Sequence, residues 1–178
     1  MLISWVRDEP VYSRIQILIH LLLVKNRHMS SSANKKKLIF SKILVAIDSS
    51  DASMEAADYA TAMSQRYNAE IYALHVIHAD VDLYGPHETS EFTRNMRNEG
   101  EKYLDKVKVK ANEKDIHIKT EIISSKDVSG GILDFAEENN IDLIVIGTRG
   151  RSGFKRLLVG SVASHVVTYA HCPVLVVK

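Results

Sequence analysis

Residues 141–167 read IDLIVIGTRGRSGFKRLLVGSVASHVV, and this stretch determines how the rest of the chain is interpreted. A short apolar run ends at Gly147 and opens into a loop of glycines and basic residues. The loop ends at Gly160 and Ser161, directly before another apolar segment typical of a helix. Glycines let backbone N–H groups approach an anion, and a helix N-terminus attracts one. The stretch therefore has the features of a phosphate-binding loop.

The glycine spacing excludes two common nucleotide-binding loops. Gly147, Gly150, Gly160 and Ser161 form the pattern G-x2-G-x9-G-S, which is neither the Walker pattern nor G-x-G-x-x-G. Positive charge is concentrated in the same loop, on Arg149, Arg151, Lys155 and Arg156. The alternative is that the glycines only form turns and the basic side chains form a solvated surface. The loop by itself leaves both interpretations open.

Composition limits the class of protein. The chain has 178 residues, of which 46% are hydrophobic, enough for one domain with a substantial core. Its net charge of +1 gives no general attraction to nucleic acid or to an anionic membrane, so we expect neither as a partner. The single cysteine, Cys172, excludes an intrachain disulfide and a cysteine-based zinc site, and fits a reducing cytoplasm.

The N-terminal segment differs from the rest of the chain. Residues 11–24, VYSRIQILIHLLLV, are apolar but interrupted by polar side chains, and are shorter than the roughly 20 residues that span a bilayer. An interfacial helix, a cleaved signal and an extension preceding a start at Met29 all remain open. We interpret residues 1–38 as an extension outside the domain or disordered, and residues 39–178 as one nucleotide-binding domain.

Strand and helix patterns alternate from Lys42 onward. We expect strands over residues 42–48, 69–78, 115–123, 141–147 and 172–177, and helices within 49–67, 88–112 and 132–140 and from Ser161. Ser50 or Asp51 would cap the first helix. Helices between successive strands predict a doubly wound α/β domain with a parallel sheet. Ligands of such sheets bind at the carboxyl ends of strands, where Asp48, Val76 and Gly147 lie.

Other chemistry-bearing residues receive ordinary interpretations. His75, His78 and His87 lack the spacing of a metal site, so we expect strand-end and loop histidines. The G-x-S-x-G pattern of a nucleophile elbow is absent, so we do not expect Ser152, Ser164 and His165 to form a serine hydrolase site. Cys172 is expected to be a packed residue before the last strand. We therefore propose no catalytic residue.

The glycine pattern resembles the signature of the universal stress protein family, in its ATP-binding branch. The resemblance covers residues 39–178: KILVAIDSSDAS resembles the family's opening strand and acidic turn, ALHVIH its second strand, and CPVLVVK its closing strand. It implies a five-stranded parallel sheet of order 3-2-1-4-5. It also implies a homodimer through the last strand. The sequence does not identify a protein partner.

The resemblance also implies the residues of an adenine nucleotide site. The base would be lined by Ala46, Ile47 and Val76. Asp48 would contact the ribose or a phosphate-bound metal, and the ribose would be bordered by Ile146 and Gly147. The phosphates would be held by Gly150, Gly160, Ser161, Val162 and Ala163. The implied ligand is ATP with Mg²⁺ or Mn²⁺.

Two positions depart from the family pattern. Ser49 stands where glycine is common, which would narrow the ribose side, and SSKDVSGG at 124–131 replaces a turn that usually contains Gly-Pro. Neither departure falls in the phosphate loop.

Two function classes follow. The first is an ATP-binding stress-response protein that acts as a nucleotide-dependent switch through its dimer, with no or only slow ATP hydrolysis. The second is an enzyme of the adenine-nucleotide hydrolase type, which would need a catalytic base near Ser161 that we do not find. A family member that acts by association without nucleotide is a third possibility, against which the three glycines argue.

Overall fold

A computed structural model describes residues 40–79, 91–148 and 159–178 of the chain. The elements in chain order are β1 (Lys42–Ala46), α1 (Asp51–Tyr67), β2 (Glu70–His78), α2 (Glu91–Asn112), β3 (Ile118–Ser125), α3 (Val128–Glu138), β4 (Leu143–Gly147), α4 (Ser161–Tyr169) and β5 (Val174–Val177). The alternation of strands and helices is the one that the sequence predicts. The expected N-terminal extension lies outside the described residues.

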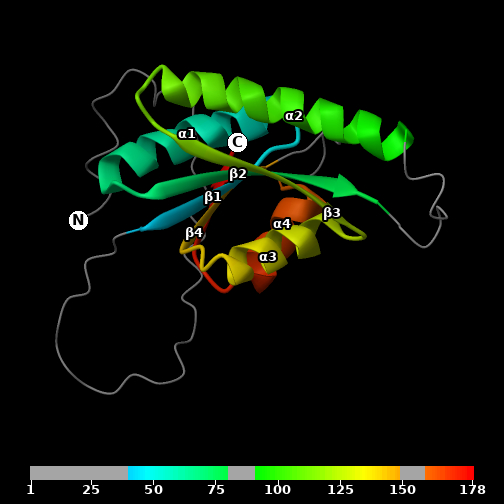
Figure 1. Cartoon of the computed structure of the whole chain (residues 1–178). Coiled ribbons are helices and arrows are strands. Elements are labelled where there is room, and N and C mark those ends of the chain that lie inside the picture. The colour runs from blue at the N-terminus through cyan, green and yellow to red at the C-terminus, as the bar shows by residue number, and fades with distance from the viewer. Residues whose placement is uncertain (1–39, 80–90, 149–158) are drawn as a thin grey trace.

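The sheet has the order β3-β2-β1-β4-β5, and every neighbouring pair is parallel, which confirms the predicted fold. The central strand β1 pairs with β2 from Lys42 to Ala46 and with β4 from Ile43 to Val45. Two helices, α1 and α2, cover one face of the sheet, and α3 and α4 cover the other (Figure 1).

Each face of the sheet has its own apolar core. Ile43, Val45 and Ile47 point toward α1 and α2, whereas Leu44 packs with residues of α3 and α4. The small residues Ala56 and Ala60 of α1 are fully buried, as the sequence predicts from their helical spacing. Because both faces are covered, the central strands are almost continuously apolar, as in other doubly wound sheets.

The start of α3 corrects one prediction. The sequence suggests a turn through residue 131 and a helix from Ile132, but α3 begins at Val128. Asp127 caps it, since its carboxylate accepts hydrogen bonds from the N–H groups of Ser129 (3.2 Å) and Gly130 (2.8 Å). Gly131 then faces β3, where an added Cβ would lie 2.9 Å from Ser125 Cβ. The glycine that suggests a turn is therefore needed for close packing inside the first helical turn.

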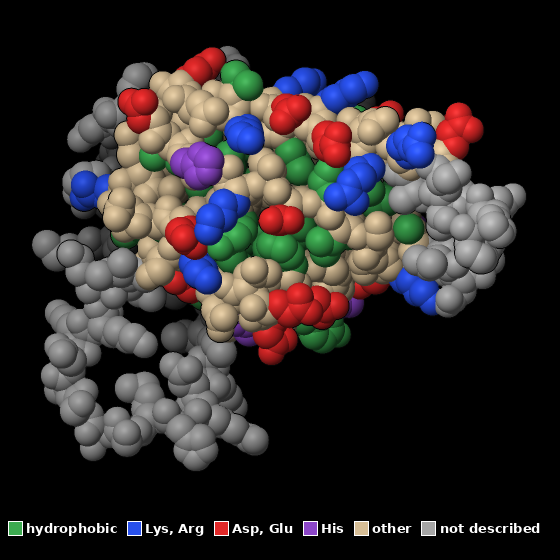
Figure 2. Space-filling view, viewed as in Figure 1, with side chains coloured by type: hydrophobic (Ala, Val, Ile, Leu, Met, Phe, Trp, Pro, Cys, Tyr) green, Lys and Arg blue, Asp and Glu red, His purple; other side chains and the backbone are tan. Residues whose placement is uncertain are grey.

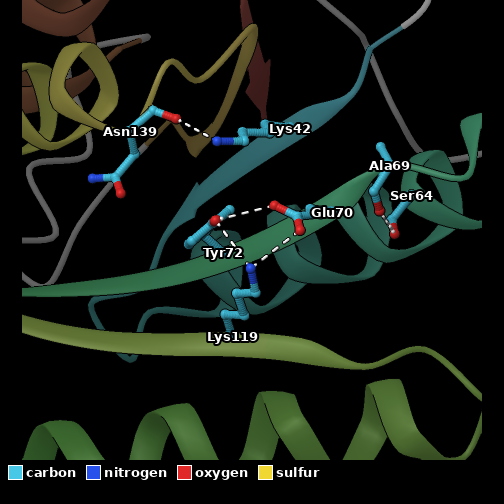
Figure 3. Close-up of polar contacts among 7 residues, drawn as sticks. All are labelled: Lys42, Ser64, Ala69, Glu70, Tyr72, Lys119 and Asn139. Carbon is cyan, nitrogen blue, oxygen red and sulfur yellow. Dashed lines mark hydrogen bonds and ion pairs between the residues drawn. The ribbon is translucent and has the colours of Figure 1, made fainter.

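The β3 edge of the sheet is polar. Lys119 Nζ donates to Glu70 Oε1 (3.2 Å) and to the Tyr72 hydroxyl (3.2 Å), and these three side chains lie together across β2 and β3 (Figure 3). The hydrogen bond from Lys119 is the main cause that lowers the pKa of Glu70. Acidic and basic side chains are interspersed on the face of the molecule in Figure 2. None of the described helices is long and apolar enough to cross a membrane.

Candidate functional site

A cavity of about 310 Å³ lies at the carboxyl ends of the strands. Every expected site residue that the structure describes lines it, namely Ala46, Ile47, Asp48, Val76, Ile146, Gly147, Gly160, Ser161, Val162 and Ala163. Gly150 lies outside the described residues. The cavity is at the point where the chain leaves β1 for one face of the sheet and β4 for the other, which is where α/β sheets of this kind bind ligands.

Asp48 is held in a fixed turn between β1 and α1. Its Oδ1 accepts hydrogen bonds from the N–H (3.1 Å) and the hydroxyl (2.6 Å) of Ser50. Ser50 is in turn the N-cap of α1, since its hydroxyl oxygen accepts from the N–H of Ser53 (3.1 Å). Within the described residues, Oδ2 of Asp48 has no hydrogen-bond partner. One carboxylate oxygen thus orients the side chain and the other is free for a ligand.

Ser49, which lies between Asp48 and Ser50 in this turn, has a φ of 73°. This left-handed conformation is disfavoured for residues with a side chain and permitted for glycine. The turn geometry therefore gives a backbone reason for glycine at this position, and this chain accepts the strain of a serine.

Gly147 lets two elements approach closely. A Cβ at this position would lie 2.8 Å from the carbonyl carbon of Ala52 and 2.9 Å from the backbone nitrogen of Ser53. The first turn of α1 therefore packs directly on the end of β4. Gly147 lines the cavity, and it is also required for the packing of α1. Its place in the glycine motif does not reveal this packing role.

The N-terminus of α4 opens toward the cavity without a side-chain cap. Its N-cap is Gly160, whose φ of −70° and ψ of 163° are accessible to any residue. The N–H of Gly160 donates to the carbonyl of Thr148 (2.6 Å). The first N–H groups of a helix have no acceptor within the helix. In α4 these are the N–H groups of Ser161, Val162 and Ala163. These N–H groups and the helix dipole favour an anion.

His75 contributes to the cavity in a way that the sequence does not show. Its Nδ1 lies 2.8 Å from the carbonyl oxygen of Ile47, so Nδ1 carries the proton and donates it. The ring packs under α2, where a Cβ added at Gly100 would lie 2.5 Å from His75 Cδ2. This side chain is structural: it fixes the end of β1 and sets how closely α2 approaches.

The cavity has further residues that sequence reasoning did not assign to the site. They are Leu74, His75, His78, Met96, Val128, Ile132 and Thr148. Met96 belongs to α2, and Val128 and Ile132 belong to α3, whose early start brings its first turns to the cavity. An apolar face of a helix signals only that it packs somewhere, so the sequence could not assign these residues to the site.

The residues considered for other chemistry have ordinary environments. Among the described residues, no group of three or more His, Cys, Asp or Glu side chains could hold a metal ion. Cys172 is buried, and burial raises the pKa of its thiol to about 11. The His165 ring contacts Tyr169 one turn along α4, with the ring centroids 4.5 Å apart and the ring planes tilted by 42°. His87 and Ser152 lie outside the described residues.

Comparison with known proteins agrees with the fold. Residues 40–178 match the model of the universal stress protein family. A universal stress protein of Methanocaldococcus jannaschii is 38% identical over 160 residues, which cover 89% of this chain and 94% of that protein. A solved universal stress protein of Lactobacillus plantarum is 30% identical, with a TM-score of 0.70 over 80% of this chain and 100% of that one.

A more distant structure shares the fold. The universal stress protein of Archaeoglobus fulgidus in complex with dAMP is 22% identical, with a TM-score of 0.61 over 79% of this chain and 100% of that one. The family model covers most of the chain, and solved members of the family share its fold. The chain belongs to the universal stress protein family.

Proposed function

We propose that this protein binds an adenine nucleotide, ATP with Mg²⁺ or Mn²⁺, and acts in the cytoplasm as a nucleotide-dependent switch in the stress response. The observation that carries the proposal is the cavity, which brings together Asp48, Gly147 and the uncapped N-terminus of α4. These parts come from the carboxyl ends of β1 and β4 and the start of α4. They supply a carboxylate, the backbone at the end of β4 and the N–H groups at the start of α4.

The base side of the cavity is apolar. Val76, Val128 and Ile132 line it, and the backbone at Val76 offers hydrogen-bonding groups for the edge of an adenine. A flat aromatic base favours such an environment because burial of its faces removes apolar surface from water. The ribose would then lie between Asp48 and the backbone at Ile146 and Gly147.

The phosphate side of the cavity is polar. The N–H groups of Ser161, Val162 and Ala163 would hold phosphoryl oxygens, as helix N-termini commonly do. Asp48 fits a role with a divalent cation, because Oδ2 is free and carboxylate oxygens are the ligands that Mg²⁺ and Mn²⁺ prefer. A bound cation would neutralise part of the phosphate charge.

The comparisons support the ligand class but not the switch. The Archaeoglobus fulgidus structure holds dAMP, an adenine nucleotide, in a protein of the same fold.

Hydrolysis would need a group that activates water. Among the described cavity residues, Asp48 is the only one with a carboxylate, and its Oδ1 already accepts two hydrogen bonds from Ser50. We therefore propose binding with at most slow hydrolysis.

Mass spectrometry of ligand released from protein purified without added nucleotide tests the ligand class. We expect ATP or ADP in amounts close to one per chain. Titration calorimetry of the ligand-free protein should then show binding of ATP and not of GTP, with tighter binding when Mg²⁺ is present. Equal affinity for ATP and GTP would contradict recognition of adenine, and no binding of either would refute the proposed function.

We also propose that the switch is a homodimer formed through β5. The carbonyls of Pro173 and Val177 accept from the N–H groups of Ile144 and Thr148, so these residues of β5 point toward β4. By strand alternation, the backbone groups of Val174 and Val176 point away from it, at an edge that no described strand covers. A second copy that pairs about a two-fold axis would cover both edges.

Light scattering tests the dimer. We expect a dimer at micromolar concentration, and a monomer for Val176→Pro, because proline removes an outward N–H and not a bond to β4. Circular dichroism of the variant checks that the fold is retained. A wild-type protein that is monomeric with and without ATP would refute assembly through this edge and leave nucleotide binding untouched.

A further inference from the structure

Thr148 is a buried polar residue at the base of the glycine loop. Its exposed fraction is 6%, and it lines the cavity. Its hydroxyl group has no hydrogen-bond partner within the described parts of the chain. The hydroxyl is not one of the enclosed side-chain groups that lack a partner among the described residues, so it is open to the cavity rather than sealed in the core.

The backbone of Thr148 is fixed on both sides. Its N–H donates to the carbonyl of Val177, which extends the pairing of β4 with β5 by one residue. Its carbonyl accepts from the N–H of Gly160 at 2.6 Å. The side chain of Thr148 is therefore held in place by the end of β5 and by the start of α4.

The side chain lies on the α4 side of the sheet. Ile144 and Ile146 pack with α3 and α4, whereas Val145 and Gly147 face α1. Because side chains alternate along a strand and the pairing continues through Thr148, the hydroxyl is on the same side as Ile146. That is the side from which the uncapped α4 approaches the cavity.

We propose that the Thr148 hydroxyl donates a hydrogen bond to a phosphoryl oxygen of the bound nucleotide. This inference rests on the proposed function, and it adds a side-chain donor to the N–H groups of α4. A phosphoryl oxygen accepts hydrogen bonds from N–H and O–H groups alike. A hydrogen bond to a charged acceptor of this kind is stronger than a hydrogen bond between neutral groups. The ligand would thereby satisfy a hydroxyl that the protein leaves unpaired.

Two substitutions separate the hydroxyl from the packing of the side chain. Thr148→Val keeps the shape and removes the hydroxyl, whereas Thr148→Ser keeps the hydroxyl. A matched control is Thr61→Val in α1, where the threonine is 4% exposed and its hydroxyl already donates to the carbonyl of Ala57 at 2.7 Å. Thr61 is not among the cavity residues.

Calorimetry with ATP, adenosine and tripolyphosphate measures the contribution of each variant. We expect Thr148→Val to weaken ATP and tripolyphosphate binding by about tenfold or more and to leave adenosine binding unchanged. Thr148→Ser should restore most of that affinity. Without ligand, Thr148→Val should melt close to the wild-type temperature, since it removes no hydrogen bond that the described residues make, and Thr61→Val should melt lower, with wild-type affinities.

The outcomes separate this inference from the proposed function. Wild-type ATP affinity in Thr148→Val would overturn the inference and leave nucleotide binding intact. An equal loss for adenosine and ATP would overturn it in favour of a ribose contact. A wild-type protein that binds tripolyphosphate but not ATP would refute the proposed adenine ligand, while the variants still test the phosphate contact. Binding of neither ligand would overturn both.

Discussion

The N-termini of α1 and α4 both face the same cavity, and they are built in opposite ways. Ser50 caps α1, and Asp48 holds Ser50, so this helix satisfies the N–H group of Ser53 from its own sequence. The N-cap of α4 is Gly160, which has no side chain to offer. The comparison indicates that one terminus contributes to the stability of the fold and the other is available to a ligand.

The two glycines next to these termini also differ. Gly147 supports α1 because any Cβ would meet the backbone of Ala52 and Ser53. Gly160 has φ and ψ values that a residue with a side chain could adopt, so its backbone conformation does not require glycine. Packing therefore explains Gly147, whereas for Gly160 of the same motif the structure shows no conformational need, and we propose ligand approach as the reason.

The largest expected effect is that of Gly147→Val. The added Cβ would lie 2.8 Å from backbone atoms of α1, and backbone cannot rotate away as a side chain can. We expect the free energy of unfolding to fall by about 3 kcal/mol, the upper range for overpacking. Urea denaturation measures this. Gly130→Ala is a control, since the nearest atom to its added Cβ is the Asp127 carboxylate oxygen, a side-chain atom, at 3.1 Å. A Gly147→Val variant with the wild-type free energy of unfolding would contradict the close packing.

Gly160→Val should show the reverse pattern. Valine can adopt the backbone conformation, so the free energy of unfolding should change little. Its side chain would stand where phosphate approaches α4, which should cost about 1.5–3 kcal/mol of ATP binding for each phosphate hydrogen bond that is lost. Calorimetry measures the affinity, and chemical denaturation measures the stability. Unchanged ATP affinity would sink the role of α4 in phosphate binding.

Ser50→Ala removes the cap of α1 and should have an intermediate effect. We expect a loss of about 1 kcal/mol in the free energy of unfolding, as is typical for N-cap replacement. Ser50→Thr keeps the hydroxyl and should remain close to wild type. ATP affinity should fall less than in Gly160→Val, because Asp48 keeps the hydrogen bond from the backbone N–H of residue 50. Equal stabilities of the alanine and threonine variants would contradict capping by this hydroxyl.

The smallest expected effect is the pH dependence that Asp127 gives to α3. The hydrogen bond from the Ser129 hydroxyl, followed by that from the Gly130 N–H, lowers the pKa of Asp127 in the folded state. Its stabilising effect is therefore present above the pKa of an unfolded aspartate, about 4, and is lost as the pH falls below that value. A smaller Coulombic contribution from His165 of α4 lowers the pKa of Asp127 in the same direction.

Thermal melts of wild type and Asp127→Asn at pH 7 and pH 3 measure this effect. We expect the variant to melt at a lower temperature at pH 7 and the difference to shrink at pH 3. The effect should be smaller than that of Ser50→Ala, because Asp127 is exposed and water screens its charge. A difference that is the same at both pH values would show that the charge of Asp127 is not involved.

The sequence predicts the sheet and much of the site for a physical reason. Strand and helix periodicities are local, and the carboxyl ends of parallel strands must meet, so Asp48, Val76 and Gly147 could be placed together without coordinates. The start of α4 at Ser161 follows from the glycine motif and is confirmed.

The rest depends on contacts between distant parts of the chain. The early start of α3 reflects a cap at Asp127 and the close approach of Gly131 to β3, which a glycine pair alone does not distinguish from a turn. The hydrogen bond from His75 to Ile47 joins residues 28 positions apart, and Met96 reaches the cavity only because α2 packs on β2. No local pattern specifies such contacts.

The burial of Cys172 has a practical consequence for spectroscopy. It is the only cysteine in the chain, and a thiol with a pKa of about 11 carries almost no thiolate at neutral pH, so it reacts slowly with maleimides. A cysteine introduced at an exposed position, such as Val109 on α2, would be labelled selectively without first removing the native one. A single fluorophore or spin label could then follow the position of α2 as nucleotide is added.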